Sequence, residues 1–452
     1  MSATPQILTP DGAGGSFLQP ELETMSQAEI RELQLQRLVE ACERVYPKVP
    51  FYRRKFDELG VKPSDIQSLE DIVKLPFTVK PDLRDNYPFD MFALPMDQIE
   101  RVQSTSGTTG APTTVAYTHQ DVQYWGECTG RGLAMAGVKP GEILQNSYGY
   151  GLFTGGPGLD YGAVRLGCVV IPMSGGNTDR QIRMMQDLKP VALSCTPSYA
   201  LHLAEVFRDR GVAPSDISLR VGIHGAEPWS NEMRAQVEAG LGETALDIYG
   251  LTEMGGPGVS VECLAKGGMH VNEDHYLAEI IDPETLQPLP DGQLGELVFT
   301  TLRRQAQPLI RYRTRDLCSL TRETCACGRT FARMSKPIGR SDDMLIIRGV
   351  NVFPSQVEEV LVTIPGIEPH YQIVVDRVGY LDVMEVWVEV GESIFAETMG
   401  DLERFQKMVQ AKLYGVLNIK AVVKLKEPKT ITRSEGKAVR VVDKRKGMLP
   451  GS

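Results

Sequence analysis

Residues 168–225 read CVVIPMSGGNTDRQIRMMQDLKPVALSCTPSYALHLAEVFRDRGVAPSDISLRVGIHG, and this stretch decides the fold. It contains three short runs rich in β-branched and apolar residues, at Cys168–Pro172, Val191–Cys195 and Val221–Gly225. The spacing of apolar residues predicts helices between and after these runs, over Asp179–Leu188, Tyr199–Arg210 and Asn231–Gly240. Short strands that alternate with helices form a largely parallel sheet. The sequence therefore predicts an α/β fold for this region.

The chain continues into two further parts. Leu294–Thr301 and Leu317–Thr321 alternate more regularly and predict an antiparallel β-subdomain. A short charged link at Gly339–Asp343 then precedes a pattern of strand, helix, strand, strand, helix and strand. We therefore predict a large N-terminal α/β domain over residues 1–339, and a small mobile α+β C-terminal domain over residues 340–452.

The composition excludes several classes of protein. The 452 residues carry a formal net charge of −10, whereas proteins that bind nucleic acid non-specifically carry an excess of Lys and Arg. No apolar run reaches the length of about 18 residues that predicts a membrane span. The first 15 residues lack the basic and apolar regions of a signal peptide. We therefore expect a cytoplasmic protein with no nucleic acid and no membrane among its partners.

The strongest local signal for chemistry is the loop Ser104-Thr-Ser-Gly-Thr-Thr-Gly-Ala-Pro112. Its glycines allow a tight turn with inward-pointing amides, and its hydroxyl side chains add donors for phosphate oxygens. The loop does not match the Walker A pattern, which needs Lys directly after the second glycine. A flexible surface loop is the more frequent meaning of this composition taken alone.

Together with four later segments, this loop resembles the motifs of adenylate-forming enzymes, a superfamily of acyl-CoA ligases, adenylation domains and luciferases. The segments follow in the family's order: Tyr249–Glu253, Arg311–Asp316, Gly339–Gly349 and Arg433–Lys437. Further stretches are similar to the phenylacetate–coenzyme A ligase branch, namely Tyr148–Gly156, Gly225–Trp229, Gly255–Cys263 and Asn351–Ser355. The loop departs from the family at Ala111, where Lys is usual, which weakens the expected contact with triphosphate.

The resemblance implies a role for each motif. Glu253, with Thr252 beside it, would hold Mg²⁺, and Lys437 would bridge the substrate carboxylate and the nucleotide. Arg340 would contact a phosphate or ribose oxygen, and Asp342 would be the hinge about which the C-terminal domain rotates between two half-reactions. The implied contacts to ATP are Ser104, Thr105, Ser106, Gly107, Thr108, Thr109, Gly110, Gly225, Ala226, Glu227, Pro228, Asp247, Tyr249, Gly250 and Asp316.

These roles fit the chemistry of activating an acid. A carboxylate is a poor acylating agent, and attack of its oxygen on the α-phosphorus of ATP gives an acyl-adenylate and pyrophosphate. The catalyst must bring two anions together and stabilise the charge on the phosphoryl oxygens. Hard cations bind carboxylate oxygens, so Glu253 suits Mg²⁺. The thiol of coenzyme A then takes the acyl group.

For each of these residues, the alternative is a role without a function in binding or catalysis. Asp316 stands among Arg311, Arg313 and Arg315 and would form a salt bridge in the simplest alternative. Glu253 would otherwise be a surface residue after a turn, and Lys437 a solvated charge. The stretch 420–446 holds ten Lys or Arg against three acidic residues, which suits either a solvated basic face or a lid that meets phosphates.

The acid is expected in a mainly apolar pocket. Tyr150 and Phe153 offer aromatic faces, Gly225 and Ala226 leave room, and Ile248 adds apolar surface. A charged partner for a second carboxylate is not apparent there, which favours an arylacetic or benzoic type of acid. The alternative is that these side chains belong to the core.

The cysteines fall into two groups. Cys42, Cys128, Cys168, Cys195 and Cys318 stand among apolar neighbours and are interpreted as core residues. Cys325 and Cys327 lie on one tight turn, and together with Cys263 and His270 they make a Cys₃His set that suits structural Zn²⁺. His275 is a substitute fourth ligand, and free thiols are the alternative to zinc.

Three functions compete. The first is a ligase that uses ATP to adenylate an aryl acid and passes the acyl group to coenzyme A. A homodimer is considered as the oligomeric state of this ligase. The second is an adenylyltransferase that leaves AMP on its acceptor, as in deazaflavin-modifying relatives. The third is a nucleotide-binding protein without catalysis. The presence of both Glu253 and Lys437 argues against the third.

Overall fold

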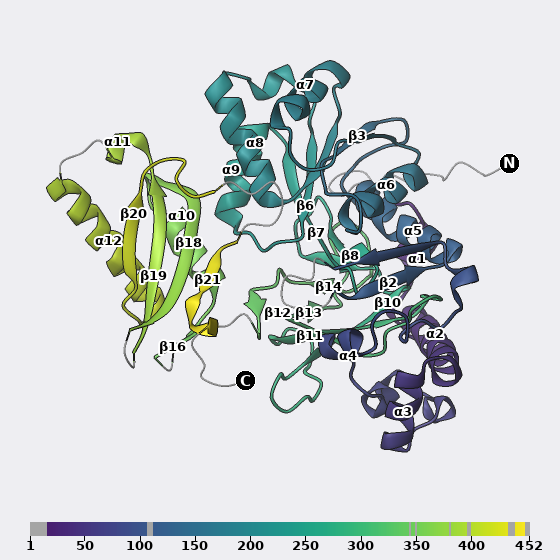
Figure 1. Ribbon diagram of the computed structural model, residues 1–452. Coiled ribbons are helices and arrows are strands. Elements are labelled where there is room, and N and C mark those ends of the chain that lie inside the picture. The colour runs from purple at the N-terminus through teal and green to yellow at the C-terminus, as the bar shows by residue number, and fades with distance from the viewer. Residues whose placement is uncertain are drawn as a thin grey trace. The chain divides into compact units, whose positions relative to one another are not determined.

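The computed structural model describes residues 16–105, 112–342, 345–348, 350–378, 381–395, 399–432 and 439–447. The chain divides into two compact units, which are described separately (Figure 1). The larger unit comprises Met1–Cys195, Ala213–Ala226 and Gly242–Lys336, and the smaller unit comprises Thr196–Val212, Glu227–Leu241 and Pro337–Ser452. The predicted boundary near residue 339 falls close to the end of the larger unit, while two earlier helical segments belong to the smaller unit.

A mixed sheet forms the centre of the larger unit, with strand order β13-β14-β9-β8-β7-β6-β5-β3-β4. The part from β7 to β4 is parallel, and the part from β8 to β13 continues antiparallel. The predicted strands at residues 168–172, 191–195 and 221–225 are confirmed as β4, β5 and β6. The strands are β3 (Ile143–Asn146), β4 (Val169–Pro172), β5 (Ala192–Cys195), β6 (Val221–Gly225), β7 (Thr244–Leu251), β8 (Gly256–Glu262), β9 (Met269–Val271), β13 (Leu320–Thr321) and β14 (Arg333–Met334).

Two glycine-rich helices of the larger unit, α5 (His119–Met135) and α6 (Gly155–Leu166), approach each other closely. A Cβ atom added at Gly162 would lie 2.4 Å from Thr129 Oγ1, so only glycine permits this approach. Their apolar side chains join residues of the sheet in one buried cluster, which includes Leu133, Leu144, Leu159, Ile223 and Val261. Helix α7 (Thr178–Leu188) lies between β4 and β5 in the chain, as predicted.

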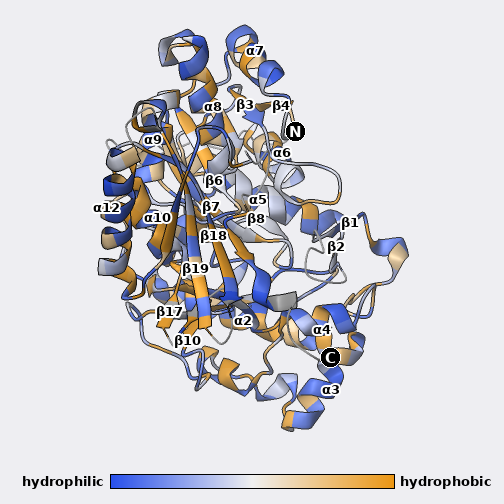
Figure 2. Cartoon of the chain, turned by 60° about the vertical axis from the view of Figure 1, so that its left-hand side comes forward, coloured by the Kyte–Doolittle hydropathy of each residue, from blue (hydrophilic) through white to orange (hydrophobic). Residues whose placement is uncertain are grey.

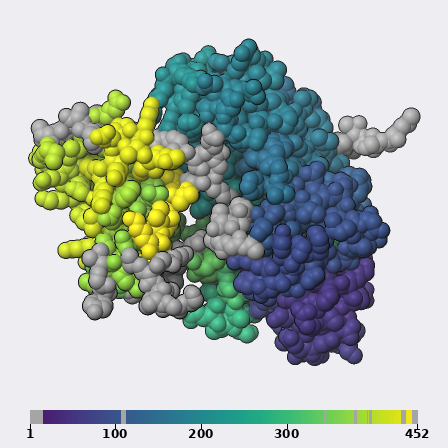
Figure 3. Space-filling view, in the orientation of Figure 1, coloured from purple at the N-terminus to yellow at the C-terminus, as the bar shows by residue number. Residues whose placement is uncertain are grey.

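A second, antiparallel sheet of the larger unit joins β10 (Tyr276–Ile281), β11 (Gly295–Thr301) and β12 (Tyr312–Cys318). This confirms the predicted β-subdomain. Residues 320–321 instead form β13 of the large sheet. The N-terminal helices share a core with this sheet, in which Leu38, Phe56, Leu297 and Phe299 are buried. The purple N-terminal residues pack against the blue segment that follows them in Figure 3.

The remaining elements of the larger unit are short or N-terminal. They are α1 (Pro20–Glu23), α2 (Gln27–Lys48), α3 (Pro50–Leu59), η1 (Pro63–Asp65), η2 (Leu69–Lys74), α4 (Lys80–Asp85), η3 (Met96–Gln98), η4 (Pro214–Asp216) and the hairpin of β1 (Arg101–Ser104) with β2 (Thr114–Tyr117).

The smaller unit contains a sheet with strand order β20-β19-β18-β21. Helices α10 and α12 bury apolar residues against it, and Figure 2 shows the mixed orange and blue residues along α12 that a one-sided apolar helix requires. The elements are α8 (Pro197–Arg210), α9 (Asn231–Leu241), β15 (Gly339–Arg340), β16 (Leu345–Ile347), β17 (Val350–Val352), α10 (Pro354–Val362), β18 (Ile367–Val378), β19 (Leu381–Val390), α11 (Glu392–Phe395), α12 (Met399–Leu417), β20 (Val422–Lys426), β21 (Val441–Asp443) and η5 (Lys444–Gly447).

Within the described ranges, every helix is too short or too polar to cross a lipid bilayer.

Candidate active site

The hairpin of β1 and β2 holds both ends of the predicted phosphate loop. The Thr105 N–H donates to the Thr113 carbonyl over 3.1 Å, and the Thr113 N–H donates to Thr105 Oγ1 over 3.1 Å. The Ser104 N–H donates to the Leu152 carbonyl over 2.9 Å. Hydrogen bonds therefore hold the residues at both ends of the loop in place. Its predicted ligands Ser106, Gly107, Thr108, Thr109 and Gly110, with Ala111, lie outside the described residues.

The carboxyl ends of β6 and β7 bring several predicted nucleotide residues together. Gly225 and Ile248 are register partners in this parallel pair. A Cβ atom at Gly225 would lie 2.0 Å from the Ile248 carbonyl oxygen, and one at Gly250 would lie 2.1 Å from the Gly256 carbonyl oxygen. Both positions therefore require glycine. Ala226 follows with a φ of 73°, a left-handed conformation that ends the strand.

Asp247 is buried on β7 and forms an ion pair with Lys336, whose Nζ lies 3.0 Å from Asp247 Oδ2. The Asp247 N–H donates to Glu262 Oε2 over 3.1 Å. The ion pair with Lys336 thus fixes the side chain of Asp247, and Glu262 of the neighbouring strand β8 binds its main chain.

Tyr249 connects the two sheets of the larger unit at the predicted ribose site. Its hydroxyl donates to Asp316 Oδ2 over 2.5 Å. Burial, together with the neighbouring Asp316 carboxylate, raises the pKa of Tyr249 well above its usual value. Tyr249 therefore stays a neutral donor, and it orients Asp316 at the point where β12 meets the large sheet.

The arginines around Asp316 have other carboxylate partners. Arg311 pairs with Glu279 over 2.8 Å, while Arg313 and Arg315 pair with Glu296 over 2.8 and 3.3 Å. Strand alternation explains this arrangement, because Asp316 is buried while Arg313 and Arg315 are only half-buried. These ion pairs provide the arginines with the structural role that the sequence left open.

Glu253 follows β7 and is only 5% exposed. Lys80 Nζ, at the start of α4, lies 3.1 Å from Glu253 Oε1. The hydroxyls of Thr252 and Thr154 lie 3.4 Å apart next to it. A carboxylate and hydroxyls thus gather between β7 and α6, and Lys80 is a charged neighbour that the sequence analysis missed.

The predicted substrate residues differ in their surroundings. Phe153 is 49% exposed, whereas Tyr150 is half-buried and its hydroxyl donates to Asp160 Oδ1 over 2.7 Å. The Asn146 amide donates to both groups, over 3.0 Å to Tyr150 and 2.8 Å to Asp160. Burial, followed by the bond to Asp160, raises the pKa of Tyr150. The sequence analysis did not predict that Asn146 and Asp160 would bind the Tyr150 hydroxyl.

In the smaller unit, Glu227 Oε1 accepts a hydrogen bond from the Ser198 N–H over 2.6 Å, and Pro228 follows Glu227 in the chain. Arg340 and Asp342 form a two-point ion pair, with both N–O distances at 2.9 Å. Lys437 lies outside the described residues. The described part of the chain thus contains the predicted hinge but not the predicted catalytic lysine.

Cys263, His270, Cys325 and Cys327 come together in the larger unit, with all four ligand atoms within 4.8 Å of one another. Cys263 Sγ lies 3.8 Å from Cys325 Sγ, and Cys327 Sγ lies 3.5 Å from His270 Nε2. Hydrogen bonds from Cys263 and His270 lower the pKa of the Cys327 thiol. Arg329 Nη1 also lies 3.6 Å from this sulfur, which favours the thiolate.

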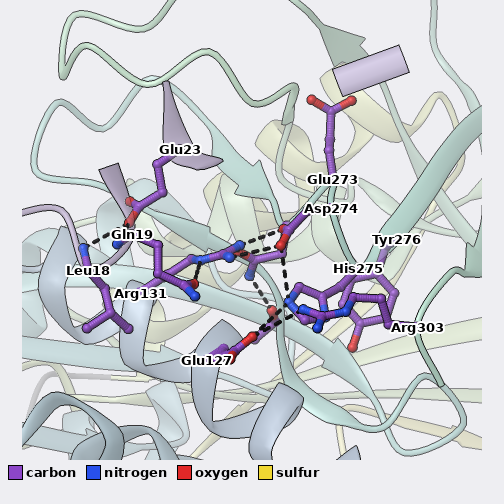
Figure 4. A network of polar contacts seen from close by, with 12 residues as sticks. Leu18, Gln19, Glu23, Glu127, Arg131, Glu273, Asp274, His275, Tyr276 and Arg303 are labelled. Carbon is purple, nitrogen blue, oxygen red and sulfur yellow. Dashed lines mark hydrogen bonds and ion pairs between the residues drawn. The ribbon is translucent and has the colours of Figure 1, made fainter. Parts of the chain in front are cut away.

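His275 is not part of this cluster, so its suggested role as a substitute ligand is wrong. Its Nε2 lies 3.3 Å from Asp274 and 3.6 Å from Glu127. Figure 4 shows it in a separate network centred on Arg131, whose guanidinium donates to Asp274 over 2.6 and 2.9 Å. Burial lowers the pKa of His275. The loop after β9 directs His275 into this network, while His270 lies on β9 itself.

Comparison with known proteins identifies the family. The AMP-binding enzyme family matches residues 93–302, and the AMP-binding enzyme C-terminal domain matches residues 349–445. The chain is 51% identical to the phenylacetate-coenzyme A ligase of Thermus thermophilus over 95% of this chain and 99% of the relative. It is 50% identical to the Escherichia coli phenylacetate-coenzyme A ligase over 94% and 97%.

Solved structures agree with this relationship. A crystal structure of 2-hydroxyisobutyryl-CoA ligase in the postadenylation state matches 99% of this chain and 96% of its own, with a TM-score of 0.91 and 32% identity. A benzoate CoA ligase from Burkholderia xenovorans, at 18% identity and a TM-score of 0.57, shares the fold. The chain therefore belongs to the phenylacetate–coenzyme A ligase family of adenylate-forming, AMP-binding enzymes.

Proposed function

We propose that the protein activates an aryl carboxylic acid resembling phenylacetate with ATP, and transfers the acyl group to coenzyme A. Acyl-CoA, AMP and pyrophosphate are the products, so the enzyme is an AMP-forming acid–thiol ligase. The observation that carries the proposal is the hydrogen bond from Tyr249 on β7 to Asp316, with Glu253 directly after the same strand. It is supported by about 50% identity to phenylacetate-coenzyme A ligases over nearly the whole chain. An adenylyltransferase is not favoured, because the most similar relatives are acid–CoA ligases.

Nucleotide binding is assigned to the larger unit. Asp316, oriented by Tyr249, would accept hydrogen bonds from the two ribose hydroxyls. Gly225 and Gly250 allow β6, β7 and β8 to pack closely where β6 and β7 end, because neighbouring backbone fills the space that a side chain would need. The open ends of parallel strands are the usual place for a nucleotide in α/β sheets.

The donor set at Glu253 fits Mg²⁺. A carboxylate with hydroxyls nearby supplies the hard oxygen ligands that this ion prefers. Mg²⁺, when bound, would neutralise charge on the phosphates of ATP. Glu253 would anchor it, and Thr252 and Thr154 would direct hydroxyl dipoles toward the same region.

Catalysis by proximity is assigned to Lys437 and Arg340. Lys437 would hold the substrate carboxylate against the α-phosphorus, which lowers the repulsion between two anions, and Arg340 would contact the nucleotide. Asp342 would absorb the rotation that replaces Lys437 with the thiol of coenzyme A. The Lys437 ammonium group is therefore required in the adenylation step only.

The acid would lie beside Tyr150 and Phe153, with Gly225, Ala226 and Ile248 forming the opposite side. Asn146 and Asp160 hold the Tyr150 hydroxyl and so fix the ring, whose face would contact an aryl group. The nearby Asp160 carboxylate would repel a second carboxylate on the substrate. This supports a monocarboxylic aryl acid.

The experiment that tests the function is a screen of pyrophosphate release over a panel of aryl and aliphatic acids, with and without coenzyme A. We expect the highest kcat/KM with arylacetic acids and an acyl-CoA among the products. An adenylated acceptor that persists in the presence of coenzyme A would favour the adenylyltransferase instead.

The Cys₃His cluster is proposed to bind structural Zn²⁺. A tetrahedral ion about 2.3 Å from sulfur and about 2.0–2.1 Å from nitrogen separates two sulfurs by about 3.8 Å, and a sulfur from a nitrogen by about 3.5 Å. The Cys263–Cys325 and Cys327–His270 distances of 3.8 and 3.5 Å agree with these values. Four protein ligands leave no open position for a substrate. The cytoplasmic location and the homodimer remain predictions.

A further inference from the structure

Lys80 and Glu253 form an ion pair that joins two segments far apart in the sequence. Their N–O distance is 3.1 Å, and the Lys80 side chain is 41% exposed while that of Glu253 is 5% exposed. The ammonium group therefore reaches the buried carboxylate from the solvent side. A cation in this place lies directly beside the group to which Mg²⁺ binding is assigned.

The backbone that carries Lys80 is held firmly. Thr78, two residues earlier, is completely buried and forms a parallel bridge with Tyr312 of β12. The Thr78 N–H donates to the Arg311 carbonyl over 3.1 Å, and the Arg313 N–H donates to the Thr78 carbonyl over 2.9 Å. The Thr78 hydroxyl also contacts the Tyr52 hydroxyl at 2.9 Å. Lys80 is thus fixed to the strand that carries Asp316.

The phosphate loop itself has no positive charge. Its nine residues, Ser104–Pro112, include neither Lys nor Arg. Amides and hydroxyls alone leave most of the charge of a triphosphate uncompensated, and phosphate sites commonly add a cationic side chain. A lysine on a rigid segment beside the metal-binding carboxylate can supply that charge.

We propose that Lys80 is a binding residue for the triphosphate of ATP, and that its ammonium moves from Glu253 to the β- and γ-phosphate oxygens when the nucleotide binds. The proposal rests on the assignment of Glu253 to Mg²⁺ in the proposed function. Lys80 would thereby take the role of the cation that the loop lacks at Ala111. An ion pair that only neutralises Glu253 would leave nucleotide affinity unchanged or improve it.

Calorimetric binding of ATP and of AMP to Lys80→Met separates these roles. We expect ATP, in the presence of Mg²⁺, to bind about ten- to a hundredfold more weakly, the range given by losing one charge-assisted hydrogen bond. AMP has no β- or γ-phosphate, so its affinity should stay within about twofold. Lys80→Arg should keep ATP affinity, and Lys74→Met, which removes a lysine paired with Asp71, is the matched control.

The decisive variant restores the charge in the loop. Ala111→Lys added to Lys80→Met should recover most of the lost ATP affinity. Unchanged ATP binding in both Lys80→Met and Lys80→Gln, or an equal loss for ATP and AMP, would overturn the proposal. These binding measurements need no acid or coenzyme A, so they can fail or succeed independently of the ligase activity.

Discussion

The bond between Tyr249 and Asp316 ties the predicted ribose acceptor to the sheet that carries the nucleotide motif. Tyr249→Phe keeps the ring and removes only the hydroxyl. A net loss of about 1 kcal/mol of orienting energy would raise the KM for ATP about fivefold and leave the KM for the acid unchanged. Initial rates of pyrophosphate release measure both constants.

Tyr46→Phe provides a matched control for this prediction. Tyr46 also donates to a carboxylate, Asp57, over 2.8 Å, but on an exposed part of α2 and α3. Its removal should not change either KM. Equal ATP constants for Tyr249→Phe and the wild type would show that the hydroxyl does not orient Asp316.

Single residues in motifs were more predictable than their partners. Gly225, Tyr249, Glu253 and Asp316 stand in recognisable local patterns, and the structure gathers them around β6 and β7. Lys80 lies in no recognisable motif. Its proposed role depends on an ion pair with a residue far away in the sequence. The selection of His270 over His275 likewise depends on which one lies on strand β9. The sequence analysis placed His270 in the set and kept His275 as a substitute, and the structure groups only His270 with the three cysteines.

At the scale of an element, a buried carboxylate binds the backbone of residues 429–431, which precede Lys437 in the chain. Glu389 is fully buried at the end of β19, and its carboxylate accepts hydrogen bonds from the backbone N–H groups of Lys429 and Ile431. Lys429 Nζ also pairs with Asp209 over 2.9 Å. The segment that leads to Lys437 therefore starts from a fixed point.

We expect Glu389→Gln to lower the adenylation rate at least about tenfold, because a small displacement of Lys437, the proposed catalytic residue, would be costly. The amide side chain offers one acceptor oxygen instead of two, so one loop N–H loses its bond. Thioester formation from supplied acyl-adenylate should be unchanged, as we also expect for Lys437→Ala. Hydrogen exchange of the loop amides provides a readout that is independent of activity.

Glu385→Gln is the control on the same strand, because Glu385 contacts Lys424 and Trp387 rather than the loop. A variant that loses both half-reactions equally, with a lower melting temperature, would indicate a general role in stability. Faster exchange at Lys429 and Ile431 without a loss of adenylation would separate the loop from the position of Lys437.

The cysteine turn is the second element with a distinct prediction. Residues 325–328 form a turn in which the Cys325 N–H donates to the Arg329 carbonyl over 3.0 Å. Zinc would fix this turn to Cys263, which follows β8, and to His270 on β9. Removing a closed structural metal should therefore reduce stability more than chemistry. For a unit of this size, a loss of a few kcal/mol corresponds to roughly 3–6 °C in melting temperature.

Elemental analysis of the purified protein, together with thermal melts before and after chelation, tests this prediction. We expect one zinc per chain, and its loss in Cys325→Ser/Cys327→Ser. Cys195→Ser is the matched control, since Cys195 is buried elsewhere on β5. Zinc content that does not fall in the double variant would identify the four groups as free thiols and an ordinary histidine.

Elements with clear periodicity were predicted well, and those that depend on distant contacts were not. The parallel strands and the helices over residues 178–188, 197–210 and 231–241 agree with their predicted ranges within two residues. Strands β13 and β14 contain only two residues each, which is too short for a periodic pattern. They form because β14 pairs with β9, and β13 pairs with β14. The buried ion pair of Arg131 with Asp274 also lacks any local signature.

For the whole molecule, the charge reversal near the C-terminus has a partly structural origin. Lys424 pairs with Glu385 over 2.7 Å, Lys429 pairs with Asp209, and Lys426 lies 4.2 Å from the centroid of the Trp387 ring. These lysines therefore have partners inside the smaller unit. Arg445 also pairs with Asp382 and Asp443, so a basic face that recruits phosphates would depend on the remaining basic residues of the stretch 420–446.

The hinge assignment leads to a prediction about the complete reaction cycle. Asp342→Pro restricts φ to about −65° at the residue that is expected to absorb the rotation. We expect one half-reaction to survive, while overall acyl-CoA formation falls at least about a hundredfold, since each half-reaction needs its own placement of the catalytic groups. Adenylation is measured as pyrophosphate exchange, and thioester formation as the consumption of supplied acyl-adenylate.

Asp342→Ala is the control, because it removes the ion pair with Arg340 but leaves φ free. If the backbone rotation matters, the alanine variant should retain the overall turnover that the proline variant loses. Loss of both half-reactions in the proline variant alone would indicate misfolding around residue 342. Normal overall turnover with proline would show that the rotation takes place at another residue.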